Sequence, residues 1–370
     1  MPIFSLETLE RLTREILQTA QVPSAEAGIV ARHLVEANLA GHDSHGVLRI
    51  PQYVEAVKSG RVCPANHPRV VSDHGCTAVL DGKMGFGQVI AKEAVELAIS
   101  KARRNGIAAV SFSNSYHTGR IASYTLMAAR EGFAAIAMVN AGGGGQSVAP
   151  FGGTSRRLAT NPLSIAAPSG NEHPVVLDIA TSVAPEGKLR DYWLKKKQVP
   201  AGWIIDAHGC PTTNPNDFYA SPGGALLPLG ASAGYKGFGL AFMVDVLAGA
   251  LSGAGCCRPE VCEPKDGLLM IVLDIAKFVP PDLFKAQVLQ LIEHVKSCPA
   301  APGFTEVYVP GEVEFREELK RRSEGIFLDD FIWAEICHTA DELGYRLPGA
   351  NEAGAAIPLD ATALDLAARG

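Results

Sequence analysis

The sequence has little of what marks nucleic-acid-binding, membrane-spanning or secreted proteins. Its 39 Asp and Glu outnumber 33 Lys and Arg, and the net charge of −6 leaves no basic surface for nucleic acid or an anionic membrane. The most apolar stretch, residues 240–251, includes Asp245 and is far shorter than the roughly 20 apolar residues of a spanning helix. We expect it to be a buried helix. The first residues lack the basic and apolar segments of a signal peptide, so we expect a cytoplasmic protein.

Common metal and nucleotide signatures are also missing. The eight cysteines show no repeated pairing with histidine partners, and we expect no metal; only Cys256, Cys257 and Cys262 form a cluster. No G-x-G-x-x-G or G-x-x-x-x-G-K-[ST] string occurs, and the glycine-rich strings at 82–87 and 234–239 have other spacings. We therefore expect neither a Rossmann domain nor a P-loop.

A chain of 370 residues that is 47% hydrophobic can form more than one globular domain. The first seventy residues look helical, with Ser24 as an N-cap, whereas strands and amphipathic helices alternate from about Cys76 onward. The tail from Pro348 is rich in Ala and poor in aromatic residues, and we expect it to be flexible. The expected helices span 5–20, 24–41, 88–105, 119–131, 237–252, 281–297, 313–322 and 331–343, and the expected strands span 107–112, 133–140, 163–167, 174–179, 268–274 and 306–309.

The segment 113–120 follows an expected buried strand and precedes a helix expected to begin near Gly119. Backbone N–H groups at a helix start attract anions, so a pyrophosphate could bind there beside Arg120. His117 stands at the carboxyl end of the strand, where open α/β sheets place reacting groups. The alternative is a polar connection in which Thr118 is a simple N-cap.

A second candidate site is the string Gly-His-Asp-Ser-His-Gly-Val-Leu-Arg at 41–49. A histidine is suited to general acid/base chemistry near neutral pH. An arginine can bind a substrate carboxylate through two parallel hydrogen bonds. Ser44, His45 and Arg49 could therefore handle a proton and a carboxylate. The alternative is a solvated helix end with Asp43 as its cap.

Other polar or glycine-rich segments follow the expected strands. Four glycines at 142–145 allow close approach of a ligand or form a mobile loop. Thr160 stands just before a strand, and Asp178 begins a segment that suits either ribose hydroxyls or helix capping. Lys236 is expected at a helix N-terminus, where a cation is disfavoured unless an anion is bound.

These strings together resemble the malate/L-lactate/L-sulfolactate dehydrogenase family. That family also contains ureidoglycolate dehydrogenase, diketogulonate reductase and the cyclic imine reductase that acts on piperideine-2-carboxylate. The match runs in order and with the right spacing from about residue 5 to 347. It is carried by Gly-His-Asp-Ser-His-Gly-Val-Leu-Arg at 41–49, Asn-Ser-Tyr-His-Thr-Gly at 114–119, Ala-Thr-Asn-Pro-Leu at 159–163, Asp-Ile-Ala-Thr-Ser at 178–182, Gly-Tyr-Lys-Gly-Phe-Gly-Leu at 234–240 and Pro-Gly-Glu at 310–312.

The resemblance implies an α/β oxidoreductase that uses NAD or NADP without a Rossmann fold. It implies a cofactor-binding domain at 76–312 around a mixed seven-stranded sheet, and a helical domain from 1–75 with a return at 313–347. The flexible tail then covers 348–370. The resemblance also implies a homodimer that acts on a small carboxylate.

The resemblance also implies roles for individual residues. Ser44 and His45 match a proton-handling pair, Arg49 matches a carboxylate-binding arginine, and Thr160 matches a substrate contact. His117 matches both an acid/base residue and a cofactor contact. The other implied cofactor contacts are Thr118, Gly119, Arg120, Ile121, Asp178, Ile179, Ala180, Lys236, Gly311 and Glu312.

Two departures from the family favour a 2-hydroxy acid and its 2-oxo acid as substrates. Lys188 stands where the imine-reducing branch has an aspartate that completes its proton relay, and we count this lysine among the substrate-binding candidates. Ala141 stands near the position of a serine in the ureidoglycolate branch. Reduction of a cyclic or open-chain imine remains the alternative. The choice between NAD and NADP stays open, as does the choice of His45 or His117 as the direct proton donor.

Overall fold

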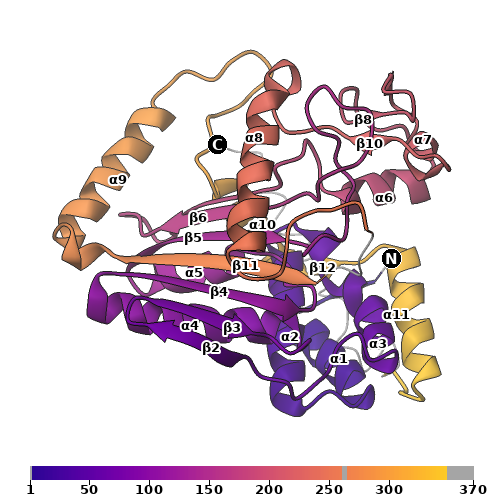
Figure 1. Cartoon of the computed structure of the whole chain (residues 1–370), viewed down its shortest axis with the longest axis horizontal. Helices are drawn as coiled ribbons and strands as arrows, with labels where there is room; N and C mark the ends of the chain where they lie inside the picture. The colour runs from indigo at the N-terminus through magenta and orange to yellow at the C-terminus, as the bar shows by residue number, and fades with distance from the viewer. Residues whose placement is uncertain (1, 261–264, 348–370) are drawn as a thin grey trace, which may run out of the picture. The chain divides into compact units, whose positions relative to one another are not determined.

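The computed structural model describes residues 2–260 and 265–347, and the chain forms two compact units. The first comprises the chain up to Ser59 and again from Glu314, and the second comprises Gly60–Val313. Figure 1 labels most of the helices and strands.

The first unit consists mainly of helices. Leu9, Leu12 and Ile16 recur at helical spacing and are buried, and the Ser5 side chain caps the helix by accepting from the Thr8 N–H. The short strands β1 and β12 pair antiparallel and join the two ends of the unit. Its elements are β1 (Ile3–Phe4), α1 (Leu6–Thr19), α2 (Ser24–Leu39), 3-10 turns at Asp43–His45 and Val47–Arg49, α3 (Ile50–Lys58), α10 (Glu312–Glu324), which begins two residues before the unit boundary, β12 (Ile326–Phe327) and α11 (Asp330–Glu342).

The second unit is built on a seven-stranded sheet of order β2-β3-β4-β11-β5-β6-β7. The pair β3–β4 is parallel and the other neighbouring pairs are antiparallel, which confirms the predicted mixed sheet. Its strands are β2 (Arg69–His74), β3 (Thr77–Asp81), β4 (Ile107–Ser115), β5 (Phe133–Asn140), β6 (Leu163–Ala167), β7 (Val175–Ile179) and β11 (Asp266–Asp274), and its helices are α4 (Gly87–Asn105), α5 (Ala122–Arg130), α6 (Glu186–Leu194), α7 (Pro215–Tyr219), α8 (Gly234–Val244) and α9 (Pro281–Lys296).

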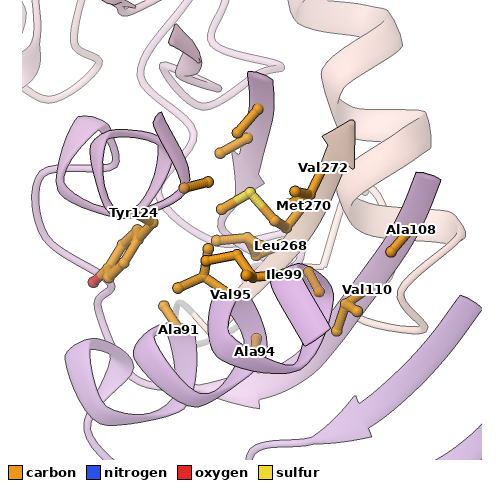
Figure 2. Close-up of a cluster of buried hydrophobic side chains, with 14 of the residues drawn as sticks. Ala91, Ala94, Val95, Ile99, Ala108, Val110, Tyr124, Leu268, Met270 and Val272 are labelled. Atoms are coloured by element: carbon orange, nitrogen blue, oxygen red, sulfur yellow. The ribbon is translucent and has the colours of Figure 1, made fainter. Parts of the chain in front are cut away.

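The largest core cluster of this unit lies between α4 and the sheet (Figure 2). Ala91 and Ala94 on α4 are small, so the helix can approach Leu268 and Met270 on β11 closely. Gly106 ends α4 in the left-handed conformation, with φ +84°, as the sequence predicts. The helices α4 and α5 cover one face of the sheet, and α8 lies on the other (Figure 1).

A second, three-stranded sheet of order β10-β8-β9 has its own small core and was not predicted. Each of its strands is only two residues long: β8 is Ile204–Ile205, β9 is Pro211–Thr212 and β10 is Ala225–Leu226. Elements this short leave no alternating pattern for a sequence to reveal.

Several sequence predictions are wrong in detail. Residues 306–309 are not a strand; instead, the Pro310 carbonyl accepts a hydrogen bond from the Val176 N–H at the edge of β7. The helix expected near Gly119 begins at Ala122, and Pro23 rather than Ser24 is the N-cap of α2. At Thr118, the N–H and hydroxyl bond to Asp266 instead of starting a helix.

The apolar stretch 240–251 is helical but not fully buried. α8 continues as a π-helical turn, Asp245–Ala250, and Phe242, Met243 and Leu251 are 53%, 48% and 59% exposed. Over the described ranges, every helix is too short or too polar to cross a membrane. The tail predicted at 348–370 lies outside the described residues.

Candidate functional site

The segment 41–49 places its chemical groups within hydrogen-bond distance of one another. It forms two 3-10 turns between α2 and α3. Ser44 Oγ lies 3.1 Å from His45 Nδ1, and Arg49 Nε donates to the Ser44 carbonyl at 2.8 Å. The Ser44–His45 pair is suited to proton transfer, since a hydroxyl and an imidazole can each donate or accept.

This segment is held by residues that the sequence analysis did not single out. Arg321 on α10 donates to both carboxylate oxygens of Asp43, at 2.6 and 3.1 Å, and to the Asn38 carbonyl at 2.7 Å. Asn38 Oδ1 accepts from the Val47 N–H at 2.8 Å. A Cβ at Gly46 would lie 2.2 Å from that oxygen, so only glycine fits there. Asp43 therefore anchors the segment and does not cap a helix.

The electrostatics of this anchor favour a permanently charged guanidinium. Burial opposes the charge of Arg321, but the hydrogen bonds that it donates to Asp43 and Glu317 raise its pKa above the ordinary value. A bidentate arginine–carboxylate pair also fixes the orientation of both groups. The anchor is therefore a rigid support for Ser44 and His45.

In the second unit, the loop between β4 and α5 contains His117, which is half-buried, and four more predicted cofactor residues. Thr118 donates through its N–H and its Oγ1 to Asp266 Oδ2, both at 2.8 Å. Gly119 has φ +76°, a conformation that favours glycine. Thr118 is not an N-cap, because α5 begins three residues after Gly119 and its N-cap is Ile121. The Thr118 N–H is also unavailable to an anion, because it is bonded to the Asp266 carboxylate.

The loop also approaches the end of β7. Arg120 Nε lies 3.6 Å from Asp178 Oδ2, and the two side chains are only 6% and 11% exposed. The structure thus brings together two predicted cofactor residues that are 58 positions apart in the sequence. Ile179 and Ala180 follow Asp178 and are half-buried.

Thr160 lies beside a buried polar network. Its carbonyl accepts from the Thr181 N–H and Oγ1 at 3.0 and 2.9 Å. The neighbouring Asn161 donates to Asp245 Oδ1 at 3.3 Å, and Asn140 donates to the same oxygen at 3.2 Å. Asp245 lies on the π-helical turn, an irregularity often found at functional sites.

Two cysteines of the predicted cluster, Cys256 and Cys257, lie beside this network and contact Asp245. Burial and Asp245 raise the pKa of the Cys257 thiol to about 11, so it stays protonated at neutral pH. Cys262 lies outside the described residues. Within residues 2–260 and 265–347, no group of three potential His, Cys, Asp or Glu ligands forms a metal site.

The remaining candidates belong to other elements of the chain. Lys236 is exposed in the first turn of α8, and Lys188 is exposed on α6. Gly311 has φ +89°, and a Cβ there would lie 2.6 Å from Val176 Cγ1. Glu312 accepts from Lys296 Nζ at 2.5 Å and from the Val309 N–H at 3.2 Å.

A glycine-rich string that did not fit a Rossmann fingerprint positions the same loop. A Cβ at Gly87 would lie 2.3 Å from the Tyr116 carbonyl oxygen and 2.4 Å from that of His117. A Cβ at Gly82 would lie 2.9 Å from the Asn114 carbonyl oxygen. These glycines therefore allow close backbone packing beneath the loop. The close spacing of these glycines in the sequence was the signal that could have revealed this packing.

Comparisons with known proteins agree with this architecture. The family model described as malate/L-lactate dehydrogenase matches residues 4–337. The chain is 38% identical to hydroxycarboxylate dehydrogenase B of Escherichia coli K12, over 92% of this chain and 94% of that protein. It is 39% identical to a malate dehydrogenase of Pyrococcus horikoshii, over 89% and 92% of the two chains.

A solved structure supports the same assignment. The crystal structure of malate dehydrogenase from Entamoeba histolytica matches with a TM-score of 0.89 at 29% identity, over 94% of this chain and 99% of that one. Because the matches span nearly the whole chain, they cover both compact units. The chain therefore belongs to the malate/L-lactate dehydrogenase family and is an enzyme of the 2-hydroxy acid dehydrogenase type.

Proposed function

We propose that the enzyme uses NAD or NADP to interconvert a small 2-hydroxy acid and its 2-oxo acid, and that the loop 117–121 binds the cofactor. The observation that carries this proposal is the Arg120–Asp178 pair, which links two predicted cofactor segments. The donor set fits a dinucleotide, since Arg120 supplies positive charge for phosphate and Asp178 supplies an acceptor for ribose hydroxyls. Gly119 allows close approach of the backbone.

The cofactor would supply hydride transfer, and the protein would supply orientation and proton transfer. Arg49 would bind the substrate carboxylate, because its guanidinium lies in the same segment as Ser44 and His45. His45, supported by Ser44, or His117 would exchange a proton with the substrate oxygen. Lys188 stands where the imine-reducing branch has the aspartate of its proton relay, which favours a 2-oxo acid over an imine.

The substrate class is tested with a panel of 2-oxo acids and cyclic imines, each offered with NADH and with NADPH. We expect oxidation of the reduced cofactor with a 2-oxo acid, and reduction of NAD or NADP by the matching 2-hydroxy acid. Turnover confined to imines would contradict the proposal. The same assays show which of the two cofactors is preferred.

Cofactor binding at the loop is tested with Gly119→Leu. A bulky residue at φ +76° distorts the loop, so NAD(P)H affinity should fall strongly in a fluorescence titration. Gly75→Leu is the matched control, because Gly75 also has positive φ, at +69°, but lies in a turn with open space around it. Native affinity in a folded Gly119→Leu variant would contradict the assignment.

We further propose that the enzyme is a homodimer in which α8 contributes to the interface. Tyr235, Phe242 and Met243 are 55%, 53% and 48% exposed and recur at helical spacing, and adjoining exposed apolar side chains often mark a protein–protein contact. Met243→Glu should shift the mass measured by light scattering from dimer to monomer. Val70→Glu, at another exposed apolar position, should leave the mass unchanged. A monomeric wild type would contradict the proposal.

A further inference from the structure

Asp266 is a buried carboxylate at the end of β11, beside the end of β4 from which the loop 116–121 leaves the sheet. It is the first residue of β11 and lies opposite Ser115, the last residue of β4. Next to it, two residues of β4 oppose the single Gly267, which makes a β-bulge. Bulges commonly redirect side chains near functional sites.

The carboxylate of Asp266 holds Thr118 by two hydrogen bonds, one to its backbone and one to its side chain. The Tyr124 hydroxyl donates to the Thr118 carbonyl. Both backbone groups of Thr118 are therefore bound by side chains from elements on either side. Gly119 and Arg120 follow directly, so the position of Thr118 sets where these residues begin.

Burying an ionised carboxylate to make this contact costs free energy. Burial raises the pKa of Asp266 to about 6, although the two hydrogen bonds from Thr118 act to lower it. The ionisable groups on neighbouring elements are His117 and Arg120 on the loop, Lys265 one residue before, and Asp245 on the π-helical turn. Among described residues, burial and Thr118 are the causes of the shift.

Asparagine would accept the same backbone hydrogen bond without burying a charge. The feature that distinguishes aspartate is the strength of hydrogen bonds to an ionised acceptor, which are about twice as strong as those between neutral groups. We propose that Asp266 is a positioning residue that fixes the cofactor-binding loop through Thr118, and that it does so as the ionised carboxylate. This inference rests on the proposed role of the loop in binding the cofactor.

The test compares NADH binding, measured by fluorescence, in wild type and Asp266→Asn between pH 5 and pH 7.5. At pH 7.5 the variant should bind NADH about tenfold more weakly, because its neutral amide makes weaker hydrogen bonds with Thr118 than the ionised carboxylate does. At pH 5, where the wild-type carboxyl is protonated, the two proteins should bind equally. Asp274→Asn, at the half-buried opposite end of β11, should follow the wild-type curve.

The pH dependence separates positioning from a general packing role. A difference in affinity that is the same at every pH, or no difference at all, would overturn the inference. Thr118→Val gives a second test if Asp266→Asn does not fold. It removes the hydroxyl donor and keeps the backbone N–H. Because the hydroxyl acts to lower the pKa of Asp266, its loss should raise that pKa. The loss of NADH affinity on acidification should then occur at a higher pH. An unchanged pH profile in Thr118→Val would also overturn the inference.

The Gly119→Leu variant separates this inference from the proposed function. If Gly119→Leu weakens NADH binding and Asp266→Asn binds as wild type does, only the role of Asp266 is wrong. If both variants bind NADH with native affinity, the loop is not the cofactor site, and both proposals fall.

Discussion

The two candidate segments differ in how they hold their chemical groups. In the segment 41–49, Ser44, His45 and Arg49 bond to one another, and the distant contact from Arg321 falls on Asp43 rather than on them. In the loop 116–121, by contrast, Thr118 bonds directly to a carboxylate 148 residues away. The first segment is preassembled locally, whereas the second depends on the sheet.

This difference indicates where each kind of residue can be replaced. A locally assembled site should lose activity chiefly through its own reactive groups, while its anchor should affect stability. A loop that is positioned by the sheet should respond to changes at residues that touch neither substrate nor cofactor. The predictions below test this distinction, from the largest expected effect to the smallest.

The largest effects are expected from the two histidines. A general acid or base contributes about 10²–10⁴-fold in rate, so His45→Ala or His117→Ala should lower kcat by this amount. The residue that acts directly on the substrate should also lose the histidine limb of the kcat pH profile. His42→Ala, in the same segment but paired with Glu314 at 3.6 Å, should have a much smaller effect. Wild-type kcat in both variants would refute the acid/base assignment.

Arg49→Met should raise KM for carboxylate substrates and spare cofactor affinity. Leaving a buried charge without its partner costs about 2–5 kcal/mol, so kcat/KM should fall by more than tenfold. Steady-state kinetics with NADH binding measured in parallel test this. Arg32→Met, in an exposed ion pair on α2, is the control. An unchanged KM would remove Arg49 from the substrate site.

Asp266→Asn should gain stability relative to the wild type as pH rises from about 4 to 6. The folded pKa of about 6 exceeds the usual 3.8, so ionising Asp266 costs stability as pH rises from about 4 to 6. The variant lacks this cost, and its advantage in free energy of unfolding should grow by about 3 kcal/mol across that window. Urea unfolding at several pH values measures it. A difference in free energy of unfolding between the two proteins that stays constant from pH 4 to pH 6 would contradict the prediction.

A smaller effect is expected at the anchor of the first segment. Arg321→Met leaves Asp43 without its bidentate partner and should lower the free energy of unfolding by about 1–3 kcal/mol. Arg322→Met is the matched control, since Arg322 forms an exposed pair with Glu318 on the same helix and should change stability by less than about 0.5 kcal/mol. Equal losses in the two variants would show that Arg321 has no special role.

The sequence revealed the regular elements better than the contacts that hold the site. The strands 133–140 and 163–167 were predicted with their observed bounds, because they are apolar runs closed by polar or turn residues. The 41–49 string was informative because its reactive residues are neighbours in the chain.

Other features could not be predicted, because they depend on partners far away in the chain. Asp266 and Arg321 look like ordinary surface charges until the fold brings Thr118 and Asp43 to them. The start of α5 was misplaced because Thr118 resembles an N-cap, although Asp266 takes its N–H. The exposure of Phe242 and Met243 was missed because a continuous apolar run in a helix suggests burial on every side.

The close approach at Gly87 has a consequence for how mutational tolerance should be interpreted. Any side chain there would press against the carbonyl oxygens of Tyr116 and His117. A saturation-mutagenesis map should therefore show position 87 as intolerant as the catalytic positions, although glycine has no group that could react or bind. Intolerance at Gly87 would reflect the close backbone packing beneath the loop and no chemical role. A search for reactive residues based on intolerance alone would therefore select this glycine wrongly.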